Sequence, residues 1–284
     1  MRRRIRIKKL PDSLSFKKRD APTISVMIRE SPAGLEARER KTNIGWNVTV
    51  HSQKLAHANI IRSMDRIVHT GDAIEWLHSQ PVLEGSSLVG SLPDISEFPG
   101  YSLEKWSEWF TDTAGLILSK TPTDGVSFFF QSDIKQDGYW VDKSFLVQKA
   151  AFEMGHKMLF HKIVCRFPVG TITMGRPSYS HVLAFTQSVK PDFQKWTADV
   201  LPDTGEKTWV RGMGLDVSMM IAQFVKDQTK STTIVNPFCG QGSMLAAANF
   251  LGLSAVGIER STKRAEAARS LLVSPDGKSF QVGL

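Results

Sequence analysis

The sequence has few cysteines and no histidine pattern typical of a metal site. Only Cys165 and Cys239 occur in 284 residues, which argues against a disulfide framework or a cysteine-rich zinc site. The seven histidines show no HxxxH or comparable spacing, so the sequence predicts no metal. A run of about 18 apolar residues is also missing, as is an apolar core near the start, so neither a membrane span nor a secretory signal is predicted.

Excess positive charge is confined to the first 20 residues. The formal net charge is +8, and residues 1–20 hold nine Lys or Arg against two Asp. A charge-driven interaction with nucleic acid therefore depends on this segment or on local patches. The segment suits a targeting peptide, a solvated tail or a phosphate-binding arm. We expect a cytoplasmic protein, or one of an organelle matrix if residues 1–20 are a targeting peptide.

From residue 66 onward, short apolar runs alternate with longer amphipathic segments, a pattern typical of an α/β protein with a mostly parallel sheet. Residues 1–65 show no strong period and are expected to be a basic N-terminal extension. The pattern predicts helices at 102–120, 142–155 and 212–229, and strands at 66–72, 86–94, 125–133, 157–166 and 180–188.

The last part of the chain contains the tightest predicted strand-helix-strand unit, TTIVNPF, GSMLAAANFLG and SAVGIE. A glycine turn that opens into a helix gathers backbone N–H groups and the positive end of the helix dipole at one point. Gly240 and Gly242 allow close approach of a ligand. Glu259 ends the next strand, where a carboxylate is well placed to accept hydrogen bonds from ribose hydroxyls.

The stretch NPFCGQGSMLAAANFLGLSAVGIE resembles motif I and the following acidic motif of S-adenosylmethionine-dependent amino-methyltransferases of the N6-adenine/N4-cytosine type, DPF(C)GSGTTLxAAxxxGxxxxGIE. RIVHTGDAIEWLHSQP and SSLVGSLPD are similar to the family's GDxLExLxxLPxxSVDLIxTDPPY. The resemblance covers roughly 66–273. It implies a Rossmann-like methyltransferase fold with a mostly parallel seven-stranded sheet, a terminal hairpin and a circularly permuted motif order. Residues 66–284 would form the methyltransferase domain, with a substrate half at 66–207 and a cofactor half at 208–284.

The resemblance also implies which residues bind S-adenosyl-L-methionine. Glu259 would take the ribose hydroxyls, and Asp72 would face the adenine amino group. Segment 208–214 (TWVRGMG) would occupy the place of the methionine-binding motif. The remaining residues implied to line the cofactor are Asn236, Phe238, Gly240, Gly242 and Ser243.

The catalytic loop implied by the resemblance is Ser91-Leu92-Pro93-Asp94, where the family has [D/N/S]-P-P-[Y/F/W]. Ser91 and the carbonyl of Leu92 would hold the target amine with its lone pair toward the methyl group. Asp94 stands where the family has an aromatic residue that stacks on a flipped base. Either Phe98 or Tyr101 supplies an aromatic face instead, or the acceptor is not a flipped base. Asp94 would then serve as a general base or orient an amine.

Two further segments are candidate substrate contacts. The loop-rich stretch 167–181, with Arg176 and Tyr179, would grip phosphate or simply cap a hairpin. The stretch 132–143 is explained equally well as a substrate contact and as a solvated loop. Cys239 is expected to be a small filler of the core.

These observations favour a methyltransferase that acts on a base nitrogen of nucleic acid. RNA, such as rRNA or tRNA, is favoured over DNA, because no separate target-recognition domain is evident and the basic segment suits a structured RNA backbone. A ribosomal or RNA-processing partner fits this reading, whereas a membrane does not. Two alternatives are a catalytically degenerate RNA or ribosome assembly factor with the same fold, and a protein methyltransferase.

Overall fold

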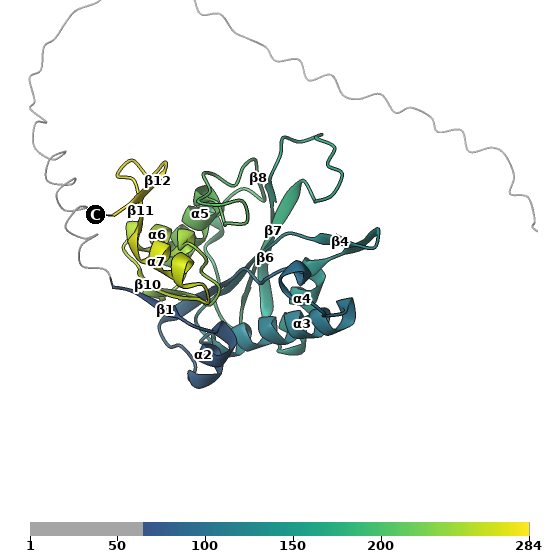
Figure 1. Ribbon diagram of the computed structural model, residues 1–284. Helices are drawn as coiled ribbons and strands as arrows, with labels where there is room; N and C mark the ends of the chain where they lie inside the picture. Colours follow the sequence, from purple (N-terminus) through teal and green to yellow (C-terminus); the bar gives the residue numbers. More distant parts are fainter. Residues whose placement is uncertain (1–64, 284) are drawn as a thin grey trace, which may run out of the picture. The chain divides into compact units, whose positions relative to one another are not determined.

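The structure, a computed structural model, describes residues 65–283 (Figure 1). This part of the chain contains one eight-stranded sheet with the order β1-β10-β9-β2-β3-β7-β6-β8. The strands are β1 (Arg66–Thr70), β2 (Ser86–Gly90), β3 (Ser127–Gln131), β6 (Lys157–Cys165), β7 (Tyr179–Thr186), β8 (Val200–Leu201), β9 (Thr233–Asn236) and β10 (Ser254–Glu259).

The sheet is mostly parallel, as the sequence predicts. Strands β1, β10, β9, β2 and β3 run parallel to one another. Strand β7 lies antiparallel between β3 and β6, so β6 and β7 form the expected hairpin. The two-residue strand β8 extends the sheet beyond the predicted seven strands by pairing with β6. Its length is too short to produce an alternating pattern in the sequence.

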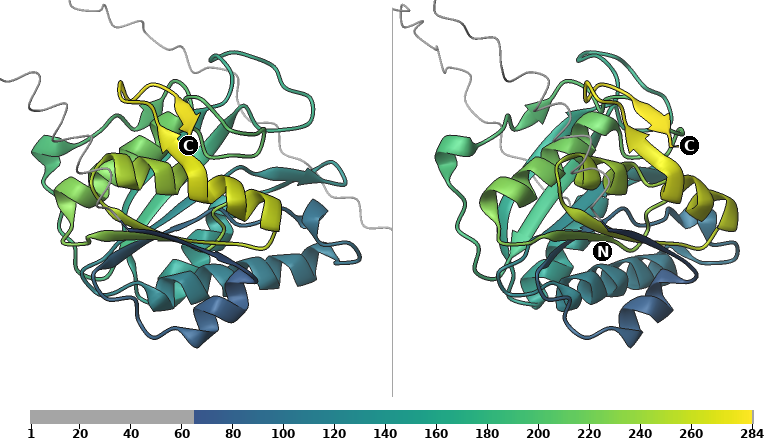
Figure 2. Two further views of the ribbon diagram at one scale, coloured as in Figure 1. Left: turned by 60° about the vertical axis from the view of Figure 1, so that its left-hand side comes forward. Right: turned by 90° about the vertical axis from the view of Figure 1, so that its left-hand side faces the viewer.

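Helices cover both faces of this sheet (Figure 2). Helices α2 (Ala73–Ser79), α3 (Leu103–Lys120) and α4 (Lys143–Glu153) pack on one face, and α5 (Leu215–Gln228), α6 (Ser243–Phe250) and α7 (Thr262–Ser270) pack on the other. Two small hairpins stand outside the sheet, β4 (Ile134–Gln136) with β5 (Tyr139–Val141), and β11 (Leu271–Val273) with β12 (Phe280–Val282). Single-turn helices occur at Ile95–Glu97 and Phe193–Lys195.

Strand β3 shows why its sequence is an unbroken aromatic run. Phe128 and Phe130 enter the core beneath α5 and α6, whereas Phe129 enters the core beneath α3 and α4. Successive side chains of a strand point to opposite faces, so a strand buried on both faces needs apolar residues at every position. The rings of Phe128 and Phe224, the latter from α5, pack in a T-shaped arrangement with 5.6 Å between their centroids.

Helix α4 begins and ends where the sequence predicts. The Asp142 carboxylate accepts a hydrogen bond from the Phe145 amide at 2.9 Å and caps the helix. Gly155 follows the helix with φ +71°, a conformation that favours glycine.

The middle of the sheet contains a crevice at the carboxyl ends of its strands. Strands β9 and β2 are neighbours, but β9 continues into α6 on one face and β2 leads into α3 on the opposite face. Ligands of open α/β sheets bind at such a divergence. Strands β9 and β10 also lie between β1 and β2, so the predicted halves 66–207 and 208–284 interleave in one sheet. None of the helices in residues 65–283 combines the length and apolar character needed to cross a membrane.

Candidate active site

A cavity of about 690 Å³ lies at the carboxyl ends of β1, β10, β9, β2 and β3. Most of the predicted site residues line it, namely Asp72, Ser91, Pro93, Asp94, Phe98, Arg176, Asn236, Phe238, Gly240, Ser243 and Glu259. Gly242, Tyr101 and Tyr179 do not line it. The cavity therefore joins the glycine turn after β9 to the loop after β2, two segments that are far apart in the sequence.

The turn after β9 has a backbone that requires glycine. The side-chain Oδ1 of Asn236 accepts a hydrogen bond from the Phe238 amide at 3.2 Å and tightens the turn. Gly240 has φ +55°, and a Cβ atom there would lie 3.6 Å from Nε1 of Trp209. The indole of Trp209 therefore stands beside the glycine turn and forms part of the cavity wall.

Gly242 is required by helix packing and does not line the cavity. It precedes α6 with φ +87°, and a Cβ atom there would lie only 2.8 Å from Cα of Ala268 in α7. The close approach of α6 to α7 therefore explains this glycine. The first residues of α6, Ser243 and Met244, do line the cavity.

Glu259 ends β10 at the cavity and is 9% exposed. Its Oε1 accepts a hydrogen bond from the Ser261 amide at 2.8 Å and lies 3.7 Å from Nη1 of Arg264. The Arg264 guanidinium also stacks on the Trp209 ring at 4.6 Å from its centroid. Arg264 and Trp209 thus tie the acidic strand end to segment 208–214, a link that nothing in the sequence pattern indicates.

Cys239 is a buried thiol in this turn. Burial, and then the nearby negative charge of Glu259, raise its pKa to about 12. A neutral, buried thiol is neither a nucleophile nor a ready metal ligand, which agrees with the expected filler role.

Asp72 occupies the turn after β1 and lines the cavity. Its Oδ1 accepts hydrogen bonds from the amides of Ile74 at 2.8 Å and Glu75 at 3.2 Å, so it caps α2. The Gly71 amide donates to the carbonyl of Glu259 at 3.1 Å and holds the ends of β1 and β10 together.

The loop Ser91-Leu92-Pro93-Asp94 is held in place by side chains of α3 and α4. The Asp94 carboxylate forms an ion pair with the ammonium of Lys143, whose side chain is 3% exposed. The Pro93 carbonyl accepts a hydrogen bond from Nε1 of Trp106 at 3.4 Å. Lys143 is a site residue that sequence analysis misses, because it reads as an ordinary first residue of a helix.

Two aromatic side chains line the cavity beside this loop. The ring of Phe98 packs against Trp109 at 4.4 Å between centroids, and both residues line the cavity. Tyr101 packs on the ring of Phe98 at 5.2 Å and carries the Lys105 ammonium 4.2 Å above its own ring. Tyr101 therefore supports Phe98 from outside the cavity.

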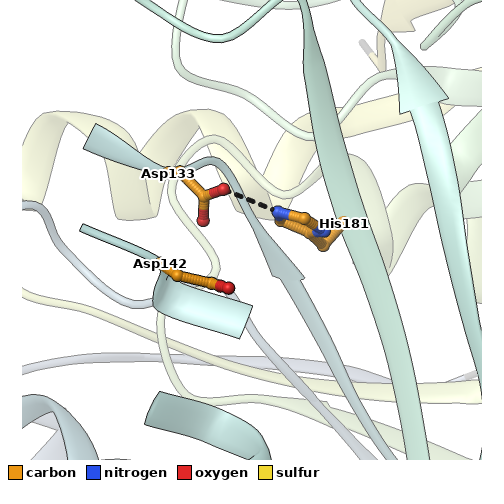
Figure 3. A group of neighbouring side chains, drawn as sticks. All are labelled: Asp133, Asp142 and His181. Carbon is orange, nitrogen blue, oxygen red and sulfur yellow. Dashed lines mark hydrogen bonds and ion pairs between the residues drawn. The ribbon is translucent and has the colours of Figure 1, made fainter. Parts of the chain in front are cut away.

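A buried polar network lies beyond the end of β3 (Figure 3). Asp133 accepts hydrogen bonds from Nε1 of Trp140 at 3.1 Å and from the Lys143 amide at 2.9 Å, and its Oδ2 lies 2.9 Å from Nε2 of His181. Although burial opposes it, these hydrogen bonds and the adjacent His181 lower the pKa of Asp133. His181 in turn contacts His161 at 2.8 Å.

Asp133, Asp142 and His181 have potential metal-ligand atoms within 4.8 Å of one another, a grouping that the sequence spacing does not reveal. Figure 3 shows the Asp133 carboxylate turned toward the imidazole of His181. Both carboxylate oxygens of Asp133 take part in the hydrogen bonds with Trp140, Lys143 and His181. The Oδ1 of Asp142 accepts hydrogen bonds from the Phe145 amide and the Ser144 hydroxyl. Hydrogen bonding within the protein thus explains the cluster.

Tyr179, the first residue of β7, and Arg176, in the segment between β6 and β7, are the two predicted contacts from stretch 167–181. The ring of Tyr179 meets His181 edge-on at 5.3 Å, and burial raises the pKa of its hydroxyl. Arg176 lines the cavity. Of the two predicted contacts in this loop, only Arg176 thus borders the site.

Comparisons with known proteins agree with this fold. No family model matches the chain, and no curated protein matches it. The solved structure of PvuII DNA methyltransferase (cytosine-N4-specific) matches 72% of this chain and 85% of its own at 16% identity, with a TM-score of 0.59. TTHA0409 of Thermus thermophilus, in complex with S-adenosyl-L-methionine, matches 72% of this chain and 92% of its own at 19% identity, with a TM-score of 0.56. The chain therefore has a Rossmann-like methyltransferase fold.

Proposed function

We propose that this protein is an S-adenosylmethionine-dependent methyltransferase that acts on a base nitrogen of nucleic acid. The observation that carries the proposal is one cavity shared by the Gly240 turn, the acidic end of β10 and the loop from Ser91 to Asp94. The loop from Ser91 to Asp94 precedes the Gly240 turn along the chain. The circularly permuted motif order that the resemblance implies is therefore part of this proposal.

The residues at one end of the cavity fit the cofactor. Gly240 leaves space that a larger side chain would fill, and Glu259 offers a carboxylate for ribose hydroxyls. Asp72 and Phe238 also line the cavity, as expected for contacts to the adenosine. When bound, the cofactor supplies an electrophilic methyl group on a sulfonium. The fold shared with the TTHA0409 complex supports this assignment.

The residues at the other end of the cavity suit an amine acceptor. The Ser91 hydroxyl and the Leu92 carbonyl would accept hydrogen bonds from the two N–H groups of the amine. These hydrogen bonds would direct the lone pair of the amine toward the methyl group. Phe98 and Trp109 form an apolar wall that removes water from the amine. The ion pair to Lys143 gives Asp94 a positioning role, because it anchors the end of the loop. Transfer would be in line, with no covalent intermediate on the protein.

The preference for RNA stays a prediction. It depends largely on residues 1–20, which lie outside the described residues. The PvuII structure is by its name that of a DNA methyltransferase, so a test needs both nucleic acids.

Cofactor binding is the first test. Isothermal titration with S-adenosyl-L-methionine should give strong binding to the wild type and a large loss with Gly240→Trp and Glu259→Ala. Glu266→Ala, on the exposed side of α7 and outside the cavity, is the matched control and should bind normally. Equal binding by all four proteins would contradict the cofactor site.

The acceptor is the second test. Tritium from labelled cofactor, added with the protein to a cell extract, should enter material that nuclease destroys, and Ser91→Ala should abolish the transfer. Parallel digestion with ribonuclease and deoxyribonuclease distinguishes RNA from DNA. Label that only protease releases would favour a protein methyltransferase, and an inactive wild type that still binds cofactor would favour the degenerate factor.

A further inference from the structure

Residues 207–214 form a flap between β8 and α5. The Leu215 amide donates a hydrogen bond to the Glu206 carbonyl at 2.8 Å and closes the base of the flap. The Asp216 amide donates a second such hydrogen bond to the Thr204 carbonyl at 3.2 Å. The flap residues that line the cavity are Lys207, Trp209, Val210, Arg211, Gly212 and Met213. The flap is therefore a loop with a fixed base that forms part of the cavity wall.

One side of the flap meets the cofactor end of the cavity. The indole of Trp209 stands beside Gly240, and the Arg264 guanidinium stacks on it 4.6 Å from the ring centroid. The same guanidinium lies 3.7 Å from the carboxylate of Glu259. A ligand that lies against the Gly240 turn and the Glu259 carboxylate would therefore contact Trp209 and fix this side of the flap.

The backbone of the flap turns sharply between Trp209 and Gly212. The Gly212 amide donates a hydrogen bond to the Trp209 carbonyl at 3.0 Å. A Cβ atom on Gly212 would lie 2.9 Å from Cδ1 of Trp209, so the indole packs directly on this turn. Trp209 and Arg211 therefore belong to one compact turn, and a shift of the indole moves Arg211 with it.

The other side of the flap meets the segment that follows the loop from Ser91 to Asp94, which we call the acceptor loop. Nη1 of Arg211 lies 3.0 Å from Oε1 of Glu97, the last residue of the single-turn helix after this loop. The Glu97 amide donates a hydrogen bond to the Asp94 carbonyl at 2.9 Å. The Arg211–Glu97 ion pair thus connects the flap to the end of the acceptor loop.

Ion pairs join these parts around the cavity. Six ion pairs occur among the described residues, and in three of them both partners line the cavity. These three are Lys143 with Asp94, Arg211 with Glu97, and Arg264 with Glu259. They follow one another from α4 through the acceptor loop and the flap to the end of β10, and so connect the two ends of the cavity.

The Arg211–Glu97 ion pair contributes little to the stability of the fold. Both side chains are more than one-third exposed, and solvent screens a pair of this kind. Such a contact forms and breaks at little cost in free energy, so a ligand that orders either partner can shift it. The pair is therefore suited to transmit ligand binding from one end of the cavity to the other.

We propose that Arg211 and Glu97 are positioning residues that couple the two ends of the cavity. A cofactor against Trp209 fixes the flap, and the ion pair transmits this order to the acceptor loop. The inference rests on the proposed function, because the cofactor and the amine are the ligands that the two ends would hold. Neither charged side chain needs to touch the reacting atoms. The gain in rate comes from holding the acceptor loop at the right distance from the methyl group.

Coupling is tested by hydrogen–deuterium exchange, followed amide by amide by NMR, with and without S-adenosyl-L-homocysteine. This demethylated cofactor cannot react. In the wild type it should slow exchange of the Glu97 and Phe98 amides about fivefold or more, a ratio within the usual range of coupling between sites. In Arg211→Gln and Glu97→Gln the slowing should be lost at these two amides and kept at the Gly212 amide of the flap.

Two matched variants keep this test decisive. The charge-reversed double variant, Arg211→Glu with Glu97→Arg, should restore the slowing, because the ion pair re-forms with its ends exchanged. Lys149→Gln breaks an exposed ion pair with Glu153 outside the cavity and should behave as the wild type. Equal slowing in the wild type and both single variants, or none in a wild type with bound cofactor, would overturn the coupling. Lower unfolding temperatures in the single variants would point instead to a structural role.

The consequence for methyl transfer is a difference between rate and cofactor binding. At saturating labelled cofactor, tritium transfer into the nucleic acid of a cell extract should fall about tenfold or more in Arg211→Gln and Glu97→Gln, and return in the double variant. Titration calorimetry should show little change in cofactor affinity. Wild-type transfer rates in both single variants would overturn the positioning role.

The two measurements distinguish this inference from the proposed function. A wild type that binds no cofactor would contradict both. Cofactor-dependent slowing that both single variants lose, without any transfer into nucleic acid, would support the coupling and contradict the nucleic-acid acceptor alone.

Discussion

Lys143 is the residue on which the loop from Ser91 to Asp94 most directly depends. Removing a buried ion-pair partner leaves the other charge uncompensated. We expect Lys143→Met to lower kcat about tenfold or more through loss of positioning, with little change in cofactor affinity. Lys149→Met, on the exposed part of the same helix, is the control.

A double-mutant cycle isolates this ion pair. Urea unfolding of wild type, Lys143→Met, Asp94→Asn and the double variant should give a coupling of about 1–3 kcal/mol in the free energy of unfolding. Additive losses would mean that the pair does not hold the loop.

The raised pKa of the Cys239 thiol leads to a second prediction at the scale of a single residue. Its pKa is raised from 9.0 to about 12 in the folded protein. The neutral thiol therefore stabilises the fold fully below pH 9, and this contribution is lost as the pH rises toward 12. Cys239→Ala should flatten the decline in unfolding free energy between pH 9 and 11, as measured by urea titration. In the native protein at pH 8, iodoacetamide should leave Cys239 unmodified by mass spectrometry, and in urea it should react.

At the scale of the elements, two glycines beside α6 allow an effect of backbone strain to be distinguished from an effect on ligand binding. Gly240 and Gly252 both have positive φ, +55° and +84°, but only Gly240 lines the cavity. Alanine at either position should lower the free energy of unfolding by about 1–2 kcal/mol, because an L-residue is strained in this conformation. Titration calorimetry should show weaker cofactor binding for Gly240→Ala alone, and equal affinities would remove the turn from the site.

The elements also show how far the sequence could be read. Helix α4 could be bounded from Asp142 and Gly155, because caps act over a few residues. For the segment of the β4–β5 hairpin, the sequence left two interpretations, a substrate contact or a solvated loop. Its strands have only three residues each, and the side chains of Tyr139 and Trp140 are exposed. Lys143 read as an ordinary first residue of a helix, since its ion pair with Asp94 depends on the packing of separate segments and not on its neighbours in the chain.

At the scale of the whole molecule, stability should decline in mild acid. Burial lowers the pKa of His156 and, with the charge of His181, that of His161. The unfolded chain therefore binds protons more readily than the folded one below the ordinary value of 6.5, so stability is lost as the pH falls through this range. Unfolding free energies from urea titrations should fall between pH 7.5 and 5.5.

The variant His156→Gln tests the source of this acid sensitivity. It should reduce the pH dependence, whereas His78→Gln, at an exposed position at the end of α2, should leave it unchanged. An unchanged slope in His156→Gln would assign the effect to other groups.

The sequence by itself determined the α/β class, the bounds of most helices and strands, and the glycine turn with its distal acid, because periodicity, caps and turns depend on residues a few positions apart. Only the tertiary structure decided what meets in the cavity. The ion pair of Asp94 with Lys143 and the stacking of Arg264 on Trp209 join residues from separate parts of the chain. These meetings depend on the strand order, which places β9 beside β2, and on the divergence of the following helices to opposite faces.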